Sequence, residues 1–199
     1  MPPGLRQEGQ VKALKAHIWD RQEDEHYVEP EWCSRRLFDK EKFVGQIWEP
    51  CCGFGTISKV ASETHKVFSS DIVDRGYKLM DVEMDFLAPG SFVSTAPNIV
   101  CNPPFDNVKA FALHAMGLRH TRKAAMIFPT ARLNAARWLQ FTPLRRIWLM
   151  TPRPSMPPGE VIARGEKPGG GKVDFCWLVW ERGYSRRPPE MRWLHRDGK

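Results

Sequence analysis

The stretch Ile47-Trp48-Glu49-Pro50-Cys51-Cys52-Gly53-Phe54-Gly55 runs directly into a helix-like segment at residues 56–64, and this arrangement decides the fold. It has the pattern of a buried strand, a glycine turn and the start of a helix. Glycines in such a turn let backbone N–H groups approach a ligand, and the helix N-terminus adds a positive dipole. A plain strand-to-helix turn needs the same glycines, so the motif alone leaves a structural and a functional interpretation open.

Strand-like and helix-like runs alternate along most of the chain. Strands separated by helical segments indicate parallel crossovers, so the sequence predicts an α/β, Rossmann-like fold with a mainly parallel sheet and helices on both faces. The last two strands have no helix between them, so the last strand should be antiparallel. We expect strands at residues 45–48, 66–69, Asn98–Cys101, 124–128, 146–150 and 173–180, and helices at 31–42, 56–64, 108–119 and 131–141.

The composition fits one domain. A chain of 199 residues, of which 42% are hydrophobic, suffices for one sizeable core. No apolar run is long enough to cross a bilayer and the N-terminus lacks a secretory pattern, so we expect a cytoplasmic protein without membrane contact. The five cysteines include no Cys-x-x-Cys pair and are expected to be reduced. No residue cluster has the spacing of metal ligands, so no metal is expected.

Positive charge is concentrated in one part of the sequence. The net charge is +7, yet residues 107–159 carry nine Lys and Arg and no Asp or Glu, so the remainder is slightly acidic. We expect this basic stretch to hold phosphates of a polyanion around a binding site, although paired charges are often ordinary solvated surface. Its members are Lys109, Arg119, Arg122, Lys123, Arg132, Arg137, Arg145, Arg146 and Arg153.

The glycine turn itself narrows the class of ligand. Its spacing is not Gly-x-Gly-x-x-Gly, which makes a dinucleotide pyrophosphate a poor match. An acidic residue at the strand end suits a cation instead. We therefore expect Glu49 to face the amino-acid half of a sulfonium cofactor, with Pro50, Gly53 and Gly55 beside it.

Two further carboxylates follow the glycine turn. Asp71 ends the second strand-like run, roughly 20 residues after the turn, where a carboxylate accepts both ribose hydroxyls of an adenosine. Its neighbour Ile72 is expected to pack on the adenine ring. Asp85, followed by Phe86, is placed to accept the exocyclic amine of that adenine. Aspartate is also a common turn former, and this alternative stays open for both positions.

The segment Asn98-Ile99-Val100-Cys101-Asn102-Pro103-Pro104-Phe105 narrows the chemistry. A buried strand ends in an amide, two prolines fix the backbone, and an aromatic follows. An aromatic amine is a poor nucleophile because its lone pair is delocalised into the ring. Donation of its N–H bonds to the Asn102 side-chain oxygen and the Pro103 carbonyl would favour the pyramidal, nucleophilic form, while Phe105 stacks on the base. We assign Asn102, Pro103, Pro104 and Phe105 to a catalytic site, with Asn102 also beside the cofactor.

These motifs resemble class I S-adenosylmethionine-dependent amino-methyltransferases that carry an Asn-Pro-Pro-Phe motif, a group that includes N6-adenine and N4-cytosine DNA methyltransferases. Specifically, the sequence is similar to small prophage-type DNA methyltransferases without a separate recognition domain, over residues 27–184. The resemblance implies S-adenosyl-L-methionine as cofactor and an exocyclic amine of a nucleic-acid base as target, with N6 of adenine in DNA expected first. A base inside a duplex must flip out to reach such a pocket.

The same resemblance adds contacts upstream of the glycine turn. In that family a Tyr-x-Thr-Pro-like segment covers the cofactor, and Tyr27-Val28-Glu29-Pro30 stands in its place here. Tyr27 and Pro30 are therefore expected to contact the cofactor, while Glu29 departs from the usual threonine. Residues 74–77 and 175–180 also resemble the corresponding segments of this group, and the resemblance implies structural roles for them.

The expected organisation is a polar leader at residues 1–26 with a possible helix at 11–21, a methyltransferase domain at 27–184 and a basic tail at 185–199. Residues 151–171 form a long loop rich in Pro and Gly between the last two strands. We hypothesise that this loop reads the target sequence; a disordered connector is the alternative. Its basic residues are Arg153, Arg164, Lys167 and, just beyond it, Lys172.

Other functions stay open on sequence grounds. Methylation of N4 of cytosine, of RNA bases or of a protein glutamine fits the same motif. A non-catalytic nucleic-acid binding protein would retain the fold, although intact Asn102 and Phe105 argue against it. A nicotinamide oxidoreductase is disfavoured by the glycine spacing. Neither the target sequence nor the oligomeric state follows from these residues.

Overall fold

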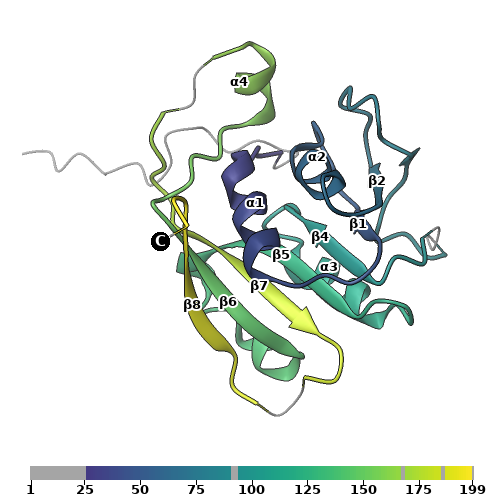
Figure 1. The fold of residues 1–199 in the computed structure, drawn as a ribbon, viewed down its shortest axis with the longest axis vertical. Helices are drawn as coiled ribbons and strands as arrows, with labels where there is room; N and C mark the ends of the chain where they lie inside the picture. Colours follow the sequence, from purple (N-terminus) through teal and green to yellow (C-terminus); the bar gives the residue numbers. More distant parts are fainter. Residues whose placement is uncertain (1–25, 91–93, 167–168, 185–186, 199) are drawn as a thin grey trace, which may run out of the picture.

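An eight-stranded sheet forms the centre of the computed structural model, which describes residues 26–90, 94–166, 169–184 and 187–198 (Figure 1). The strand order is β3-β2-β1-β4-β5-β7-β6-β8, and β7 alone runs antiparallel to its neighbours. The predicted mainly parallel α/β sheet and the antiparallel strand near residues 173–180 are thus confirmed. The strands are β1 (Ile47–Glu49), β2 (Val67–Asp71), β3 (Val82–Glu83), β4 (Asn98–Cys101), β5 (Lys123–Pro129), β6 (Leu144–Thr151), β7 (Phe175–Glu181) and β8 (Glu190–His195).

The central strands are short apolar runs, as expected where helices cover both faces of a parallel sheet. Every residue of β1, β4 and β5 is buried. β1 pairs in parallel with both β2 and β4, with Ile47 opposite Val67 on one side and Asn98 on the other. The carboxyl ends of these three strands therefore meet at one edge of the sheet, where the strand order reverses and ligands of α/β proteins usually bind.

Helices pack on both faces and complete two hydrophobic clusters (Figure 1). On one face, α1 (Glu31–Lys40) and α2 (Thr56–Ser62) bury Leu37 and Ile57. On the other, α3 (Val108–Gly117) buries Phe111. Full burial of a side chain of this size contributes about 1.5–3 kcal/mol. Among the described helices, none has the length and apolar character required to cross a membrane.

The prediction of a helix at residues 131–141 was wrong. Two short 3₁₀ helices, η1 (Thr130–Arg132) and η2 (Arg137–Phe141), occupy this connection instead. Asn134 between them favours turns over helix interior. A 3₁₀ turn also places residues three apart on one side, which directs both Ala136 and Leu139 into the core.

Three elements were not expected from the sequence. β8 follows the predicted last strand, lies within the residues assigned to a basic tail and pairs in parallel with β6. Its mixed polar pattern is typical of an edge strand and gives a weak signal. β3 is only two residues long. The short α4 (Gly159–Ala163) interrupts the loop at residues 151–171, while the helix expected at residues 11–21 lies outside the described residues.

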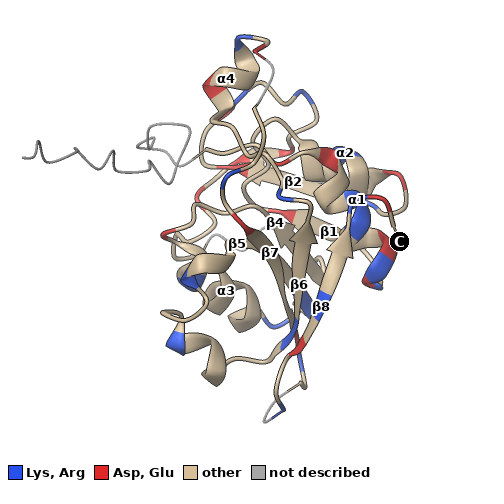
Figure 2. Cartoon of the chain, turned by 90° about the vertical axis from the view of Figure 1, so that its left-hand side faces the viewer, with Lys and Arg blue, Asp and Glu red and all other residues tan. Residues whose placement is uncertain are grey.

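The basic stretch does not gather around one site, contrary to expectation: its members are spread over α3, β5, β6 and the adjoining connections. Lys and Arg also lie outside the stretch, for example on α1 (Figure 2). Lys123, Arg145 and Arg146 lie near the beginnings of β5 and β6. Because both strands run parallel to β4, these residues lie at the opposite edge of the sheet from Asn102. Arg132 is paired with Asp106 at 2.8 Å. The clustering of charge in sequence was therefore not clustering in space.

A buried ion network closes that opposite edge. The Glu41 side chain is 1% exposed and accepts hydrogen bonds from Lys123 at 3.0 Å, Arg146 at 2.7 Å and the Trp148 indole at 2.9 Å. Burial alone would raise the pKa of Glu41, but the hydrogen bonds from these three donors outweigh the effect of burial and lower the pKa. Glu41 thus joins the end of α1 to β5 and β6.

Replacement of Glu41 by Gln should lower the free energy of unfolding by about 3–5 kcal/mol, because two cations then lose a buried partner. Urea unfolding at pH 7 measures this. Because the folded-state pKa of Glu41 is lowered, its contribution is present above the unfolded pKa and is lost as the pH falls through the folded value. The exposed Glu31→Gln variant is the control, and an equal effect of both variants would contradict the assignment.

Candidate functional site

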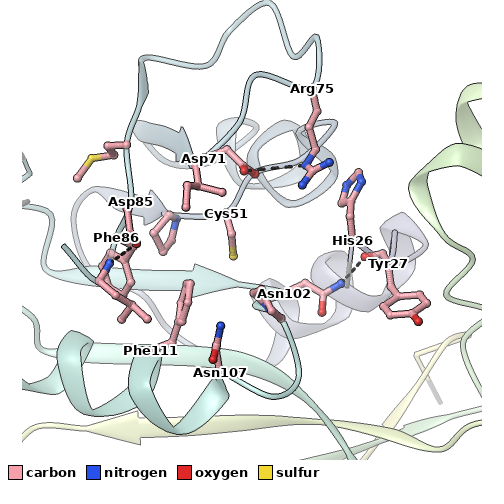
Figure 3. Close-up of a pocket in the computed structure, with 15 residues that line it drawn as sticks. His26, Tyr27, Cys51, Asp71, Arg75, Asp85, Phe86, Asn102, Asn107 and Phe111 are labelled. Atoms are coloured by element: carbon pink, nitrogen blue, oxygen red, sulfur yellow. Dashed lines mark hydrogen bonds and ion pairs between the residues drawn. The ribbon is translucent and has the colours of Figure 1, made fainter. Parts of the chain in front are cut away.

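A cavity of about 230 Å³ lies at the carboxyl edge of β1, β2 and β4 (Figure 3). Acidic side chains and an amide share its wall with aromatic and aliphatic groups, a combination typical of ligand sites. The residues that the sequence predicted and that line this cavity are Tyr27, Pro50, Asp71, Ile72, Asp85, Phe86, Asn102 and Pro104. Motifs spread over nearly 80 positions of sequence are therefore brought to one place by the parallel strands.

The other predicted residues surround this cavity. Glu49 and Gly53 line a second cavity of about 20 Å³, with Glu29 and Asn102 in the same wall. Gly55 precedes α2 and Pro30 precedes α1, while Pro103 is buried beneath the turn. The small cavity and the larger one share His26, Tyr27, Cys51 and Asn102, so they are neighbours.

Asp71 fastens the glycine turn to the end of β2. Its Oδ2 accepts a hydrogen bond from the Gly53 N–H at 2.8 Å, and its Oδ1 accepts one from the Val73 N–H at 3.2 Å. The Nε of Arg75 lies 4.0 Å from the same carboxylate. An ionised carboxylate has about four acceptor positions, so Asp71 retains capacity for further donors at the cavity wall.

Asp85 is held in a similar way on the far side of the cavity. It accepts a hydrogen bond from the Leu87 N–H at 2.8 Å, which is the turn-forming role left open from sequence. The adjacent Phe86 is buried and packs edge-on against Trp48, with ring centroids 5.1 Å apart. Ile72 is 58% exposed, so its side chain is available at the cavity rim.

Two buried carboxyl groups lie beside the small cavity. Burial raises the pKa of Glu49 well above its usual range, against the hydrogen bond donated by Ser58, and the charge of Glu29 raises it further. Burial also raises the pKa of Glu29 to about 7, opposed by hydrogen bonds from its own backbone and from Asn102. In the described part of the chain no Lys or Arg pairs with either group. A cation bound beside them would favour the ionised form of both carboxyl groups.

Asn102 lies where the two cavities meet. Its Nδ2 donates to the Tyr27 carbonyl and to Glu29 Oε2, both at 2.8 Å. Its Oδ1 is buried and has no hydrogen-bond partner among the described residues. A buried acceptor without a partner costs about 1–3 kcal/mol, so this oxygen is suited to an N–H donor from a ligand.

Phe105 makes ring contacts within the protein. Its ring stacks on Tyr27 with centroids 5.7 Å apart and an interplanar angle of 8°, and it packs against Phe175 at 5.4 Å. Tyr27 therefore covers one face of the Phe105 ring. The structure thus joins Phe105 to Tyr27, which the sequence placed on the cofactor side.

Several cavity residues were missed by sequence reasoning. Arg75, Asn107 and Phe111 line the cavity, as does His26, whose Nε2 would lie 2.6 Å from a Cβ added at Gly53. The pattern of α3 indicates that Phe111 is a core residue. Its position in the first helical turn after the Asn-Pro-Pro-Phe motif was the sequence signal that could have placed it at the cavity. No sequence signal marked His26, because its contact with the glycine turn depends on the path that the upstream segment takes in the folded chain.

The long loop holds this upstream segment in place. The Val28 N–H donates to the Pro157 carbonyl and the Gly159 N–H to the His26 carbonyl, both at 2.9 Å. Tyr27 and Pro158 form an antiparallel bridge between the same two segments. The loop at residues 151–171 therefore reaches the site through backbone hydrogen bonds. Of its basic residues, Arg153 pairs with Asp174 and Arg164 with Glu160, while Lys167 lies outside the described residues.

Comparison with solved structures identifies the fold. The chain is similar to a type I restriction-modification system methyltransferase subunit from Streptococcus thermophilus, at 12% identity and a TM-score of 0.52, covering 79% of this chain and 45% of that one. A predicted O-methyltransferase from Agrobacterium tumefaciens gives 15% identity, a TM-score of 0.52 and coverage of 83% and 84%. The 23S rRNA methyltransferase ErmE gives 16% identity and a TM-score of 0.52, and the match covers 82% of this chain and 72% of that one.

These similarities show that the chain has the Rossmann-like methyltransferase fold, and identities this low carry no more than the fold. The chain spans less than half of the Streptococcus protein. The printed names include an O-methyltransferase and an rRNA methyltransferase, so the fold does not select the accepting atom. No protein-family model and no curated protein matches the sequence. Function must therefore be argued from the site.

The glycine turn gives a test of the site's geometry. Gly55 has a left-handed φ of +76°, and a Cβ there would collide with the Tyr77 ring. Gly55→Ala should therefore lower the free energy of unfolding by about 2–4 kcal/mol, since left-handed strain and overpacking add. In the control Gly183→Ala, with φ of +87° and open space around it, only the strain of about 1–2 kcal/mol remains. Equal losses in urea unfolding would disprove the contact.

Proposed function

We propose that this chain is an S-adenosylmethionine-dependent methyltransferase that methylates an exocyclic amine of a nucleic-acid base, with N6 of adenine in DNA as the target. One observation carries the proposal: the buried, unpartnered Oδ1 of Asn102 at the meeting point of the two cavities. An acceptor in that position can bind an N–H group. An amine has two N–H bonds to donate and can be oriented by both, whereas a hydroxyl donates only one bond and a carbon nucleophile donates none.

The chemistry of the cavity walls fits the cofactor. Glu29 and Glu49 supply two buried carboxyl groups beside the glycine turn, and a cationic amino-acid half bound there would favour their ionised forms. The larger cavity offers Asp71 and Asp85 for hydroxyl and amine donors and apolar groups such as Phe86 for the adenine ring. An adenosine needs this pairing of acceptors with an apolar slot. Bound there, S-adenosylmethionine would supply a methyl group on a sulfonium sulfur.

The residues of this chain orient the target amine. Asn102 Oδ1 and the Pro103 carbonyl accept its two N–H bonds, which turns the nitrogen lone pair out of the base plane toward the methyl. The lone pair forms the new N–C bond as the C–S bond breaks, and the amine afterwards releases one proton to solvent. No side chain needs to act as a strong base, so positioning supplies most of the acceleration. The two prolines limit backbone movement during this step.

Four observations support nucleic acid as the substrate. The net charge of +7 favours a polyanion. The Asn-Pro-Pro-Phe motif resembles that of DNA amino-methyltransferases, and the fold is similar to a restriction-modification methyltransferase subunit. Exposed pairs such as Arg153 with Asp174 contribute little free energy within the protein, so phosphates can compete for these arginines.

The decisive experiment identifies the labelled product. The purified chain is incubated with tritiated S-adenosylmethionine and, separately, with unmethylated plasmid DNA, ribosomal RNA and a protein mixture. We expect tritium in DNA, recovered as N6-methyldeoxyadenosine after digestion to nucleosides. Label in N4-methyldeoxycytidine would change the assigned base to cytosine, and label in RNA would change the assigned polymer to RNA. Label only in protein, or in none of the three polymers, would refute the proposal.

Asn102→Ala should reduce methyl transfer by at least about a hundredfold while leaving cofactor affinity within about threefold, because Asn102 holds the target amine and the cofactor is fixed elsewhere. Calorimetry measures the affinity and tritium incorporation the rate. Asn134→Ala, an exposed asparagine between the 3₁₀ helices, is the matched control. Activity of Asn102→Ala within threefold of the unmodified protein would remove Asn102 from the mechanism.

Asp71→Ala should weaken cofactor binding by about 1–3 kcal/mol, through loss of a buried acceptor for ligand hydroxyls. The control is Asp81→Ala, because Asp81 also accepts a backbone N–H, that of Ser69 at 2.7 Å, but does not line the cavity. If both variants bind the cofactor equally well in calorimetry, Asp71 only fastens the backbone and contacts no ligand.

A further inference from the structure

The orientation of the Asn102 amide is set by its two neighbours. Nδ2 donates to the Tyr27 carbonyl and to Glu29 Oε2. A carbonyl and an ionised carboxylate can only accept, so both require the NH₂ side of the amide. The amide then has only its oxygen, Oδ1, left for a ligand.

We propose that Glu29 is a positioning residue that keeps Asn102 Oδ1 directed at the target amine, and that protonation of Glu29 switches transfer off. The inference rests on the proposed function for its effect on the rate, whereas the amide orientation itself stands on the hydrogen bonds. A threonine at this position, which the resemblance leads one to expect, has a hydroxyl that both donates and accepts. Such a hydroxyl fits either orientation of the amide, but an ionised carboxylate fits one.

A protonated Glu29 loses this selectivity. Its neutral carboxyl accepts more weakly and gains an O–H donor, which can bind Oδ1 of a flipped Asn102 amide. The flipped amide would present an NH₂ group to the target amine, and two donors cannot bond to each other. The acceptor needed for transfer is then lost.

The surroundings of Glu29 bring this protonation near neutral pH. Burial raises its pKa to about 7, against the hydrogen bond from Asn102. Glu49 lies in the wall of the same small cavity, and Cys33 of α1 lies close enough for the Glu29 charge to raise the pKa of its thiol. His26 and Tyr27 precede Glu29 on its own segment. Among the described residues, no Lys or Arg pairs with Glu29 to hold it ionised.

The first test measures rates as a function of pH. For the unmodified protein, kcat/KM for the cofactor at saturating DNA should fall about tenfold for each unit below pH 7, since this parameter reports protonation in the cofactor-free enzyme. Glu29→Gln should remove this limb, because Gln does not titrate, and lower kcat about three- to tenfold above pH 8. Glu29→Ala should lower kcat about ten- to a hundredfold at saturating cofactor and DNA. Exposed Glu31→Gln is the matched control and should keep the limb.

The second test needs no activity. The side-chain NH₂ resonances of Asn102, assigned by their loss in Asn102→Ala, should shift with pH with a midpoint of about 7 in the unmodified protein. The transition should persist in Glu49→Gln and disappear in Glu29→Gln. A transition that persists in Glu29→Gln, or a pH limb retained by that variant, would overturn the role of Glu29. Absence of methyl transfer by the unmodified protein with this transition present would instead refute only the proposed function.

Discussion

Parallel pairing of β1 with both β2 and β4 is the constraint on which the site depends. It places Glu49, Asp71 and Asn102, each at or just after a strand end, along one edge of the sheet. The same pairing reverses the strand order there, so the connections to α2 and α3 leave toward opposite faces and a cavity remains between them. Loss of register by one residue would turn each side chain to the other face and dismantle the site.

Buried acidic groups at the two edges of the sheet have opposite environments. At the amino edge, Glu41 has three donors and a lowered pKa, and it contributes to the stability of the folded chain. At the carboxyl edge, Glu29 and Glu49 have no such cationic partners among the described residues, and burial raises both pKa values. Uncompensated burial costs free energy, and such cost is concentrated at functional sites because a ligand can repay it.

The sequence predicted which residues meet at one edge of the sheet better than it predicted the distribution of charge on the surface. Glu49, Asp71 and Asn102 could be placed together because each ends or follows a strand pattern, and parallel topology brings these strand ends to one edge; their roles toward a ligand stay predictions. The helix at residues 131–141 was wrong because Asn134 favours a turn between two short 3₁₀ helices. The basic stretch was wrong because the sequence pattern does not show at which edge of the sheet each charge lies. His26 and the pairing of Glu29 with Asn102 were beyond prediction, since they depend on the path of the upstream segment over the glycine turn.

That path links the long loop to the chemistry of the site. The backbone of residues 157–159 holds His26 and Val28 through two hydrogen bonds, and the next residue, Glu29, holds Asn102. The segment is also fixed at its other end, where Pro30 precedes α1. The Tyr27 carbonyl and the Glu29 carboxyl are the acceptors that orient the Asn102 amide, so one continuous set of hydrogen bonds joins the loop backbone, the upstream segment and the amide at the pocket.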